Sequence, residues 1–128
     1  MDFVLLRRAS VWDPNADVIL DEEGGFVVVR VELAGIDSDR LQVFADERYL
    51  YIAGRRAQSG SGCSGSFLQK EIADGEFVKR IRIPANVAQD DVTATYADGI
   101  LTVALPVSAN AYAPLRTEIH MTVKRVPA

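Results

Sequence analysis

The sequence of 128 residues has one cysteine, one histidine and no apolar run as long as a membrane span. A single cysteine excludes a disulfide within the chain and fits a reducing compartment. A membrane-spanning helix needs roughly 18 consecutive apolar residues. The apolar stretch at residues 3–6 is far shorter, and two arginines follow it instead of preceding it, which does not fit a signal peptide. We therefore expect a cytoplasmic protein with no membrane partner.

The sequence also lacks an excess of positive charge. It has 14 lysines and arginines against 18 aspartates and glutamates, which gives a net charge of −4. Binding to a phosphate backbone relies on clustered positive charge, so no nucleic-acid partner is expected. A chain of this length and average composition is long enough to bury one hydrophobic core. We therefore expect a single globular domain.

Groupings of residues that carry out catalysis are missing as well. A thiol nucleophile needs a neighbouring base, and a metal needs several ligands. Cys63 and His120 are far apart in the sequence, and the acidic residues fall mostly in turns. We therefore expect no enzyme active site and no metal site. Cys63 is expected to be an exposed thiol, with a disulfide between two chains under oxidation as the alternative.

One glycine pattern, Gly60-x-Gly62-x-x-Gly65, has the spacing of a dinucleotide-binding fingerprint. That fingerprint requires a strand directly before it and a crossover helix after it. Here residues 55–59 are polar or small, and any helix after Gly65 would end at Asp74-Gly75. We therefore expect no nucleotide cofactor, and we predict a flexible loop rich in glycine and serine.

Apolar and polar residues alternate in several short segments separated by turn residues. Val27, Val29, Val31 and Leu33 share one phase, which is typical of a half-buried antiparallel strand. Strands are predicted within residues 18–21, 26–35, 41–45, 49–54, 77–84, 92–96 and 100–106. No helix longer than two turns is expected. The spacing predicts an all-β fold, an antiparallel immunoglobulin-like β-sandwich. Further core positions are predicted at Leu41, Val43, Leu50, Ile52, Phe77, Ile81, Ile83, Val92, Ala94, Leu101, Val103 and Leu105.

The clearest local signal is the hairpin in residues 95–106, TYADGILTVALP. Asp98-Gly99 suits a two-residue turn whose central residues both have positive φ angles. A second signal is the C-terminal alternation of Ile119, Met121 and Val123, which follows a polar linker. It predicts either a last strand on the chain's own sheet or a detachable strand that adds to the sheet edge of another subunit.

Residues 94–101, ATYADGIL, resemble the signature of the alpha-crystallin domain of small heat shock proteins, an alanine followed by Gly-aliphatic-Leu. Residues 26–43, 49–56 and 75–87 resemble further segments of the bacterial and archaeal members, in the expected order. The resemblance implies an N-terminal arm at residues 1–14, unusually short for the family. It also implies an alpha-crystallin domain at 15–107, with a dimerisation loop at 56–75, and a C-terminal extension at 108–128.

The resemblance further implies an ATP-independent holdase chaperone that binds partly unfolded clients and forms homodimers or larger homo-oligomers. The alternative is an adaptor like the CS domain or p23, which would bind one specific partner chaperone. Lys79 stands where the family usually has an arginine. The implied dimerisation-loop residues are Phe67, Leu68 and Ile72, and the signature hairpin comprises Ala94, Gly99, Ile100 and Leu101. The implied docking motif is Ile119, Met121 and Val123, and the groove that receives it is lined by Leu41, Val43, Val92 and Ala94. The implied client-binding residues are Phe3, Leu5, Leu6 and Trp12.

Overall fold

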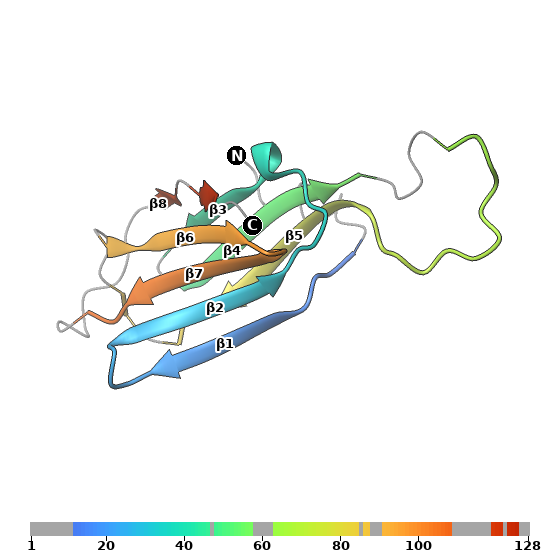
Figure 1. Cartoon of the computed structure of the whole chain (residues 1–128). Coiled ribbons are helices and arrows are strands. Elements are labelled where there is room, and N and C mark those ends of the chain that lie inside the picture. Colours follow the sequence, from blue (N-terminus) through green and yellow to red (C-terminus); the bar gives the residue numbers. More distant parts are fainter. Residues whose placement is uncertain are drawn as a thin grey trace.

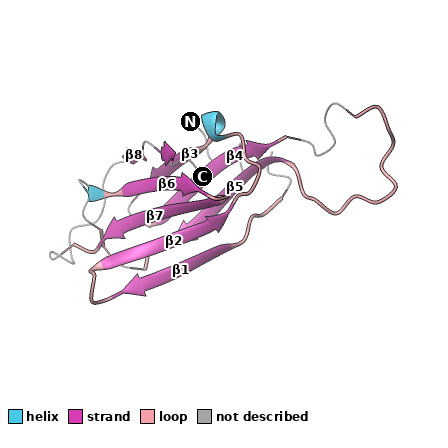
Figure 2. Cartoon of the chain, in the orientation of Figure 1, coloured by secondary structure: helices cyan, strands magenta, loops and turns pink. Residues whose placement is uncertain are grey.

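The computed structural model describes residues 12–46, 48–57, 63–84, 86–87, 91–108, 119–121 and 123–125. They form two β-sheets that pack face to face (Figure 1). Strands dominate the described residues, and a short 3-10 turn, η1 (Ser38–Arg40), precedes β3 (Figure 2). The first sheet has the order β1 (Ala16–Asp21), β2 (Phe26–Glu32), β7 (Ile100–Pro106), β6 (Thr93–Ala97) and β9 (Val123–Arg125). The second has the order β5 (Gly75–Arg82), β4 (Tyr49–Arg56), β3 (Gln42–Ala45) and β8 (Ile119–Met121).

All strand pairs in the two sheets are antiparallel except β6 with β9, which is parallel. The predicted all-β sandwich is therefore confirmed. The predicted strand boundaries differ by only a few residues, because turn residues such as Asp46 fix most ends. Its carboxylate accepts hydrogen bonds from the backbone N–H groups of Arg48 and Tyr49.

The core lies between the two sheets and consists of the residues whose alternation predicted it. Val29 pairs with Val103 across β2 and β7, and both side chains are at most 1% exposed. From the opposite sheet, Ile52 and Phe77 pack into the same cluster. Of the predicted core positions, Ile83 and Val92 are only half-buried and lie at its margin. No charged or polar side chain is buried among the described residues, so apolar contact dominates the cohesion of the sandwich.

The predicted hairpin turn between β6 and β7 is present. Asp98 has a φ of 53° and Gly99 a φ of 77°, as a turn with two left-handed residues requires. This geometry matches the right-handed twist of the flanking strands, which places β6 in register beside β7.

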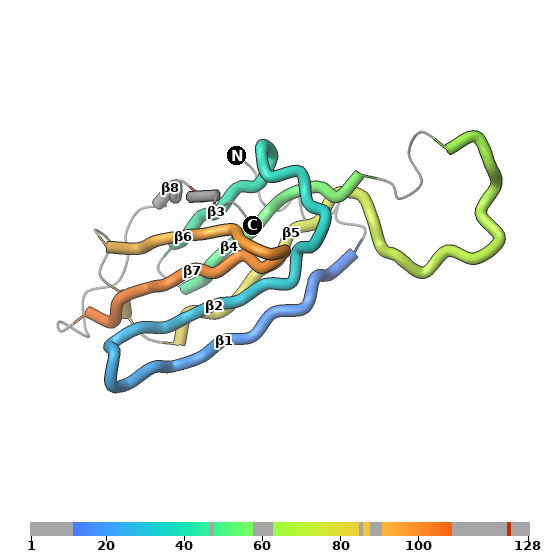
Figure 3. The backbone as a smooth tube through the Cα atoms, viewed as in Figure 1, coloured from blue at the N-terminus to red at the C-terminus, as the bar shows by residue number. Residues whose placement is uncertain are grey.

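A long connection leaves the sandwich after β4 and returns at β5. Its described part, residues 63–74, contains no strand and projects away from both sheets (Figure 3). At its root, Arg56 and Gly75 are direct partners in the β4–β5 pair. The connection therefore begins and ends at one point on the sandwich.

Candidate functional site

The signature hairpin rests on the turn that follows β2. The backbone N–H of Leu33 donates to the carbonyl oxygen of Gly99 at 2.7 Å, and the Tyr96 hydroxyl donates to the carbonyl oxygen of Leu33 at 2.6 Å. Ala94 and Leu101 are buried, whereas Ile100 is half-buried. The hairpin residues therefore belong to the scaffold of the sandwich, and β6 also pairs with the C-terminal strand β9.

The C-terminal strands run along the margins of both sheets. Met121 of β8 is the Cα partner of Val43 in β3, and Val123 of β9 is the partner of Ala94 in β6. The chain thus crosses from one sheet to the other between residues 121 and 123. In this single chain the tail pairs with its own sandwich.

Four residues were predicted to line the receiving groove. Two of them are strand partners of tail residues, and the other two pack in or against the core. Val43 and Ala94 lie directly opposite tail residues, and both are buried. Leu41 is buried just before β3, and Val92 is half-buried against the core. The structure therefore brings the predicted motif and part of its predicted groove together by backbone register.

At the other margin of the first sheet, β1 pairs with β2 on one side and has no neighbour on its other side among the described strands. The N–H of Glu32 donates to the carbonyl oxygen of Asn15, so Asn15 and alternate residues after it bond to β2. The backbone groups of Ala16, Val18 and Leu20 consequently face the open edge. The side chains of Val18 and Leu20 are 46% and 52% exposed. β1 thus offers both backbone hydrogen bonds and apolar surface.

The projecting loop carries the second set of exposed apolar side chains. Phe67 is 52% exposed, Leu68 is fully exposed and Ile72 is 59% exposed. Lys70 lies over the Phe67 ring and pairs with Asp74 at 2.7 Å, which gives the loop some local order. All three predicted anchors are therefore available for contact with another chain. Cys63 in the same loop is a free, exposed thiol, as expected.

Of the predicted client-binding residues, Phe3, Leu5 and Leu6 lie outside the described residues. Trp12 is half-buried at the root of the loop, where its indole N–H donates to the carbonyl oxygen of Gly75 at 3.0 Å. No local sequence pattern predicts this contact, because residues 12 and 75 are 63 positions apart. A tryptophan and a proline directly before the first strand were the only local hint.

Lys79 and Arg80 point to opposite sides of β5. The Lys79 ammonium group lies 3.2 Å from the Asp13 carboxylate of the same chain. The Arg80 guanidinium lies over the Tyr49 ring, 4.6 Å from its centroid. Lys79, which stands where the resemblance implies an arginine, is therefore paired with Asp13 of the same chain.

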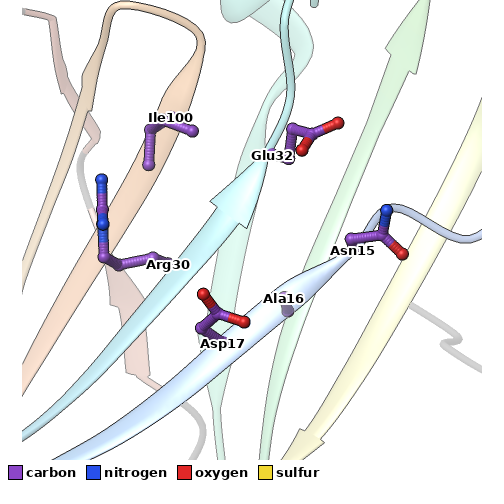
Figure 4. Close-up of a pocket in the computed structure, with 6 residues that line it drawn as sticks. All are labelled: Asn15, Ala16, Asp17, Arg30, Glu32 and Ile100. Carbon is purple, nitrogen blue, oxygen red and sulfur yellow. The ribbon is translucent and has the colours of Figure 1, made fainter.

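An open depression of about 140 Å³ lies on the outer face of the first sheet (Figure 4). Asp17, Arg30 and Glu32 contribute its charges, and all three are exposed. In the described ranges, no three histidine, cysteine or acidic side chains are grouped as metal ligands would be. The described part of the chain also has no helix long and apolar enough to cross a bilayer. The exposed large apolar side chains of the described residues lie instead on β1 and the projecting loop, and at Phe26 and Val107.

Burial raises the pKa of Tyr51, on β4, above its ordinary value of 10.0, and the nearby Asp46 charge adds to the effect. The Arg80 guanidinium opposes this shift. The hydroxyl therefore stays neutral over the physiological pH range. Such a group can donate a hydrogen bond on this face of the second sheet.

The sequence and the fold of this chain are both similar to those of known heat shock proteins. "Small heat shock protein C4" of Rickettsia felis is 31% identical over 97 residues, which cover 76% of this chain and 58% of the relative. "16.9 kDa class I heat shock protein 3" of Oryza sativa is 30% identical over 131 residues, covering 80% of this chain and 88% of the relative. The chain spans only about three fifths of the first of these relatives.

Among solved structures, "Heat shock protein 16.0 from Schizosaccharomyces pombe" matches with a TM-score of 0.71 and 31% identity. The match covers 80% of this chain and 71% of that one. The sequence pattern of the family described as "Hsp20/alpha crystallin family" matches residues 18–124, from the open β1 strand to the tail. This chain therefore belongs to the Hsp20/alpha crystallin family.

Proposed function

We propose that this protein is an ATP-independent holdase chaperone, which binds partly unfolded clients in the cytoplasm and prevents their aggregation. The observation that carries the proposal is apolar surface left exposed on β1 and on the projecting loop. Burying such surface against a client is favourable by roughly 25 cal/mol per Å² and requires no nucleotide. Family membership supports the same role, whereas it does not favour an adaptor of the CS or p23 kind.

In the absence of a client, the resting unit is a homodimer in which the loop of each subunit pairs with β1 of the other, and a client gains these surfaces when the subunits separate. Three features support this arrangement: the open backbone edge of β1, its exposed side chains, and three exposed apolar residues on the loop. Exposed strand edges readily accept a further strand. Burying each large loop side chain would contribute roughly 1.5–3 kcal/mol.

The C-terminal strands provide the contact for larger assemblies. The tail reaches both β3 and β6, and a polar linker from residue 108 to residue 118 precedes it. Tails of neighbouring subunits are proposed to exchange, with Ile119, Met121 and Val123 occupying the same groove in another copy. Such an exchange makes the same contacts as the single chain and therefore favours assembly at high subunit concentration.

The holdase proposal is tested by heating an aggregation-prone client without ATP, with and without this protein at equal subunit ratio, and recording light scattering. Suppression of scattering supports the proposal. An unrelated protein of similar size and charge is the control. Unchanged scattering with several clients would overturn the proposal and leave only the fold assignment.

A further inference from the structure

Trp12 lies where the projecting loop returns to the sandwich. Its indole N–H bonds to the carbonyl oxygen of Gly75, the first residue of β5. Its ring packs edge to face on Phe77, with centroids 5.1 Å apart. Aromatic pairs of this geometry add to the free energy gained by burial. The innermost part of the arm is thus bound to the end of the loop.

Arg56 lies where the same loop leaves the sandwich, and it contacts three separate segments. Its Cζ is 4.0 Å from the centroid of the Trp12 ring. Its Nε donates to the carbonyl oxygen of Ala73 at 2.7 Å, and a terminal nitrogen donates to the carbonyl oxygen of Ala34 at 3.1 Å. A planar guanidinium can make these directional bonds while it stacks on an aromatic ring.

A third contact fastens the arm one residue further on. Both carboxylate oxygens of Asp13 lie 3.2 Å from the Lys79 ammonium group. Trp12 and Asp13 therefore contact β5, while Arg56 connects Trp12 to both ends of the loop. No single residue would hold the loop in one direction, but together these contacts do.

We propose that Trp12 and Arg56 form a clasp that sets the direction in which the loop leaves the sandwich, and that this clasp couples the arm to dimer formation. The inference rests on the proposed function, in which the loop makes the dimer. A loop held in the pairing direction loses less conformational entropy when it binds the partner. Because coupling is reciprocal, a client that pulls the arm away from the clasp weakens the dimer, and dimer formation strengthens the clasp.

The clasp is tested by measuring dimer dissociation with analytical ultracentrifugation. Trp12→Ala removes the stack and the indole donor and should raise the dimer Kd about tenfold. Trp12→Phe keeps the ring, and Arg56→Lys keeps the charge, so each should raise Kd by about threefold to fivefold. Arg55→Ala is the matched control: this neighbouring arginine has only a 4.0 Å ion pair with Glu76, and its variant should keep the wild-type Kd.

Truncation separates the clasp from the rest of the arm. A chain lacking residues 1–11 keeps Trp12 and should retain the wild-type Kd. A chain lacking residues 1–14 loses both Trp12 and Asp13 and should dissociate at least as readily as Trp12→Ala. Hydrogen exchange of the amides at residues 63–74 should accelerate in the clasp variants, because the loop root is released. Unchanged exchange and Kd in Trp12→Ala would overturn the proposal. If circular dichroism shows that Trp12→Ala is unfolded, the exchange rates and Kd values of Trp12→Phe and Arg56→Lys test the proposal instead.

Deletion of residues 58–66 distinguishes failure of the clasp from failure of the dimer. A monomeric deletion variant with an unaffected Trp12→Ala dimer would refute the clasp but keep the role of the loop. A deletion variant that stays dimeric would refute the loop-mediated dimer and the coupling together. If the deletion variant is monomeric and the clasp variants form weaker dimers, the results support both the clasp and the loop-mediated dimer.

Discussion

Gly99 lies against the backbone of Ala34, where a Cβ built at position 99 would be only 3.2 Å from the Ala34 Cα. This close approach joins the signature hairpin to the turn after β2. The left-handed φ of 77° is a second reason for glycine at this position. Both requirements are independent of assembly, so a substitution of Gly99 should change the stability of the subunit and leave its assembly unaffected.

Gly99→Ala should lower the free energy of unfolding by about 2 kcal/mol, the sum of left-handed strain and crowding against Ala34. Gly25→Ala is the matched control, because Gly25 has a φ of 76° but no atom within 4 Å of an added Cβ. It should cost about 1 kcal/mol, from strain alone. Urea unfolding of both variants measures the difference, and equal losses would show that the contact with Ala34 is unimportant.

Val18→Pro should abolish the dimer while leaving the sandwich folded. The N–H of Val18 faces the open edge of β1, so proline removes a donor that β2 does not use. Val18→Ala is the control, because it shortens the side chain but keeps the N–H. Ultracentrifugation should find a monomer for proline and a weakened dimer for alanine. A proline variant that dimerises normally would place the interface elsewhere.

Leu68→Ser combined with Ile72→Ser should weaken the dimer without reducing subunit stability. Both side chains are more than half exposed in the single chain, so neither contributes to its core. The loss of their burial in the dimer should raise Kd at least about a hundredfold. The nearby Gln69→Ala is a polar control on the same loop and should leave Kd unchanged. A lower melting temperature of the isolated subunit would contradict this assignment.

Most of the sandwich could be predicted from the sequence because its information is local. The alternation at Val27, Val29 and Val31 fixes which face of β2 is buried, and Asp98-Gly99 fixes the register of β6 on β7. Long-range choices could not be predicted in the same way. The contact of Trp12 with Gly75 and Phe77 depends on tertiary structure that no short pattern encodes. The tail left two alternatives open for the same reason: its pattern fits an edge of its own sheets or of another copy's.

A chain that ends at residue 118 lacks β8 and β9. It should therefore expose the edge of β3 that pairs with β8 and the edge of β6 that pairs with β9. Amide exchange in both strands should accelerate about tenfold, because their partners β8 and β9 are absent. A peptide of residues 118–126 added in excess should restore protection, which would show that the groove accepts a tail in trans. A peptide with Ile119, Met121 and Val123 replaced by aspartate is the control and should have no effect. Unchanged exchange in the truncated chain would show that the tail does not cover these strands.

Tyr51 should titrate above pH 10.0, because burial and the Asp46 charge both disfavour the phenolate. A folded-state pKa above the unfolded value means that the folded protein holds this proton longer. The resulting stability is present below pH 10.0 and is lost as the pH rises through the folded pKa. Tyr51→Phe should therefore lose less stability than the wild type between pH 10 and pH 11.5. Asp46→Asn keeps an oxygen acceptor for the turn but removes the charge, so it should lower the pKa of Tyr51. Absorbance at 295 nm, with the signal of Tyr51→Phe subtracted, measures the pKa of Tyr51 in the wild type and in Asp46→Asn. A wild-type midpoint at or below pH 10.0 would refute the raised pKa of Tyr51.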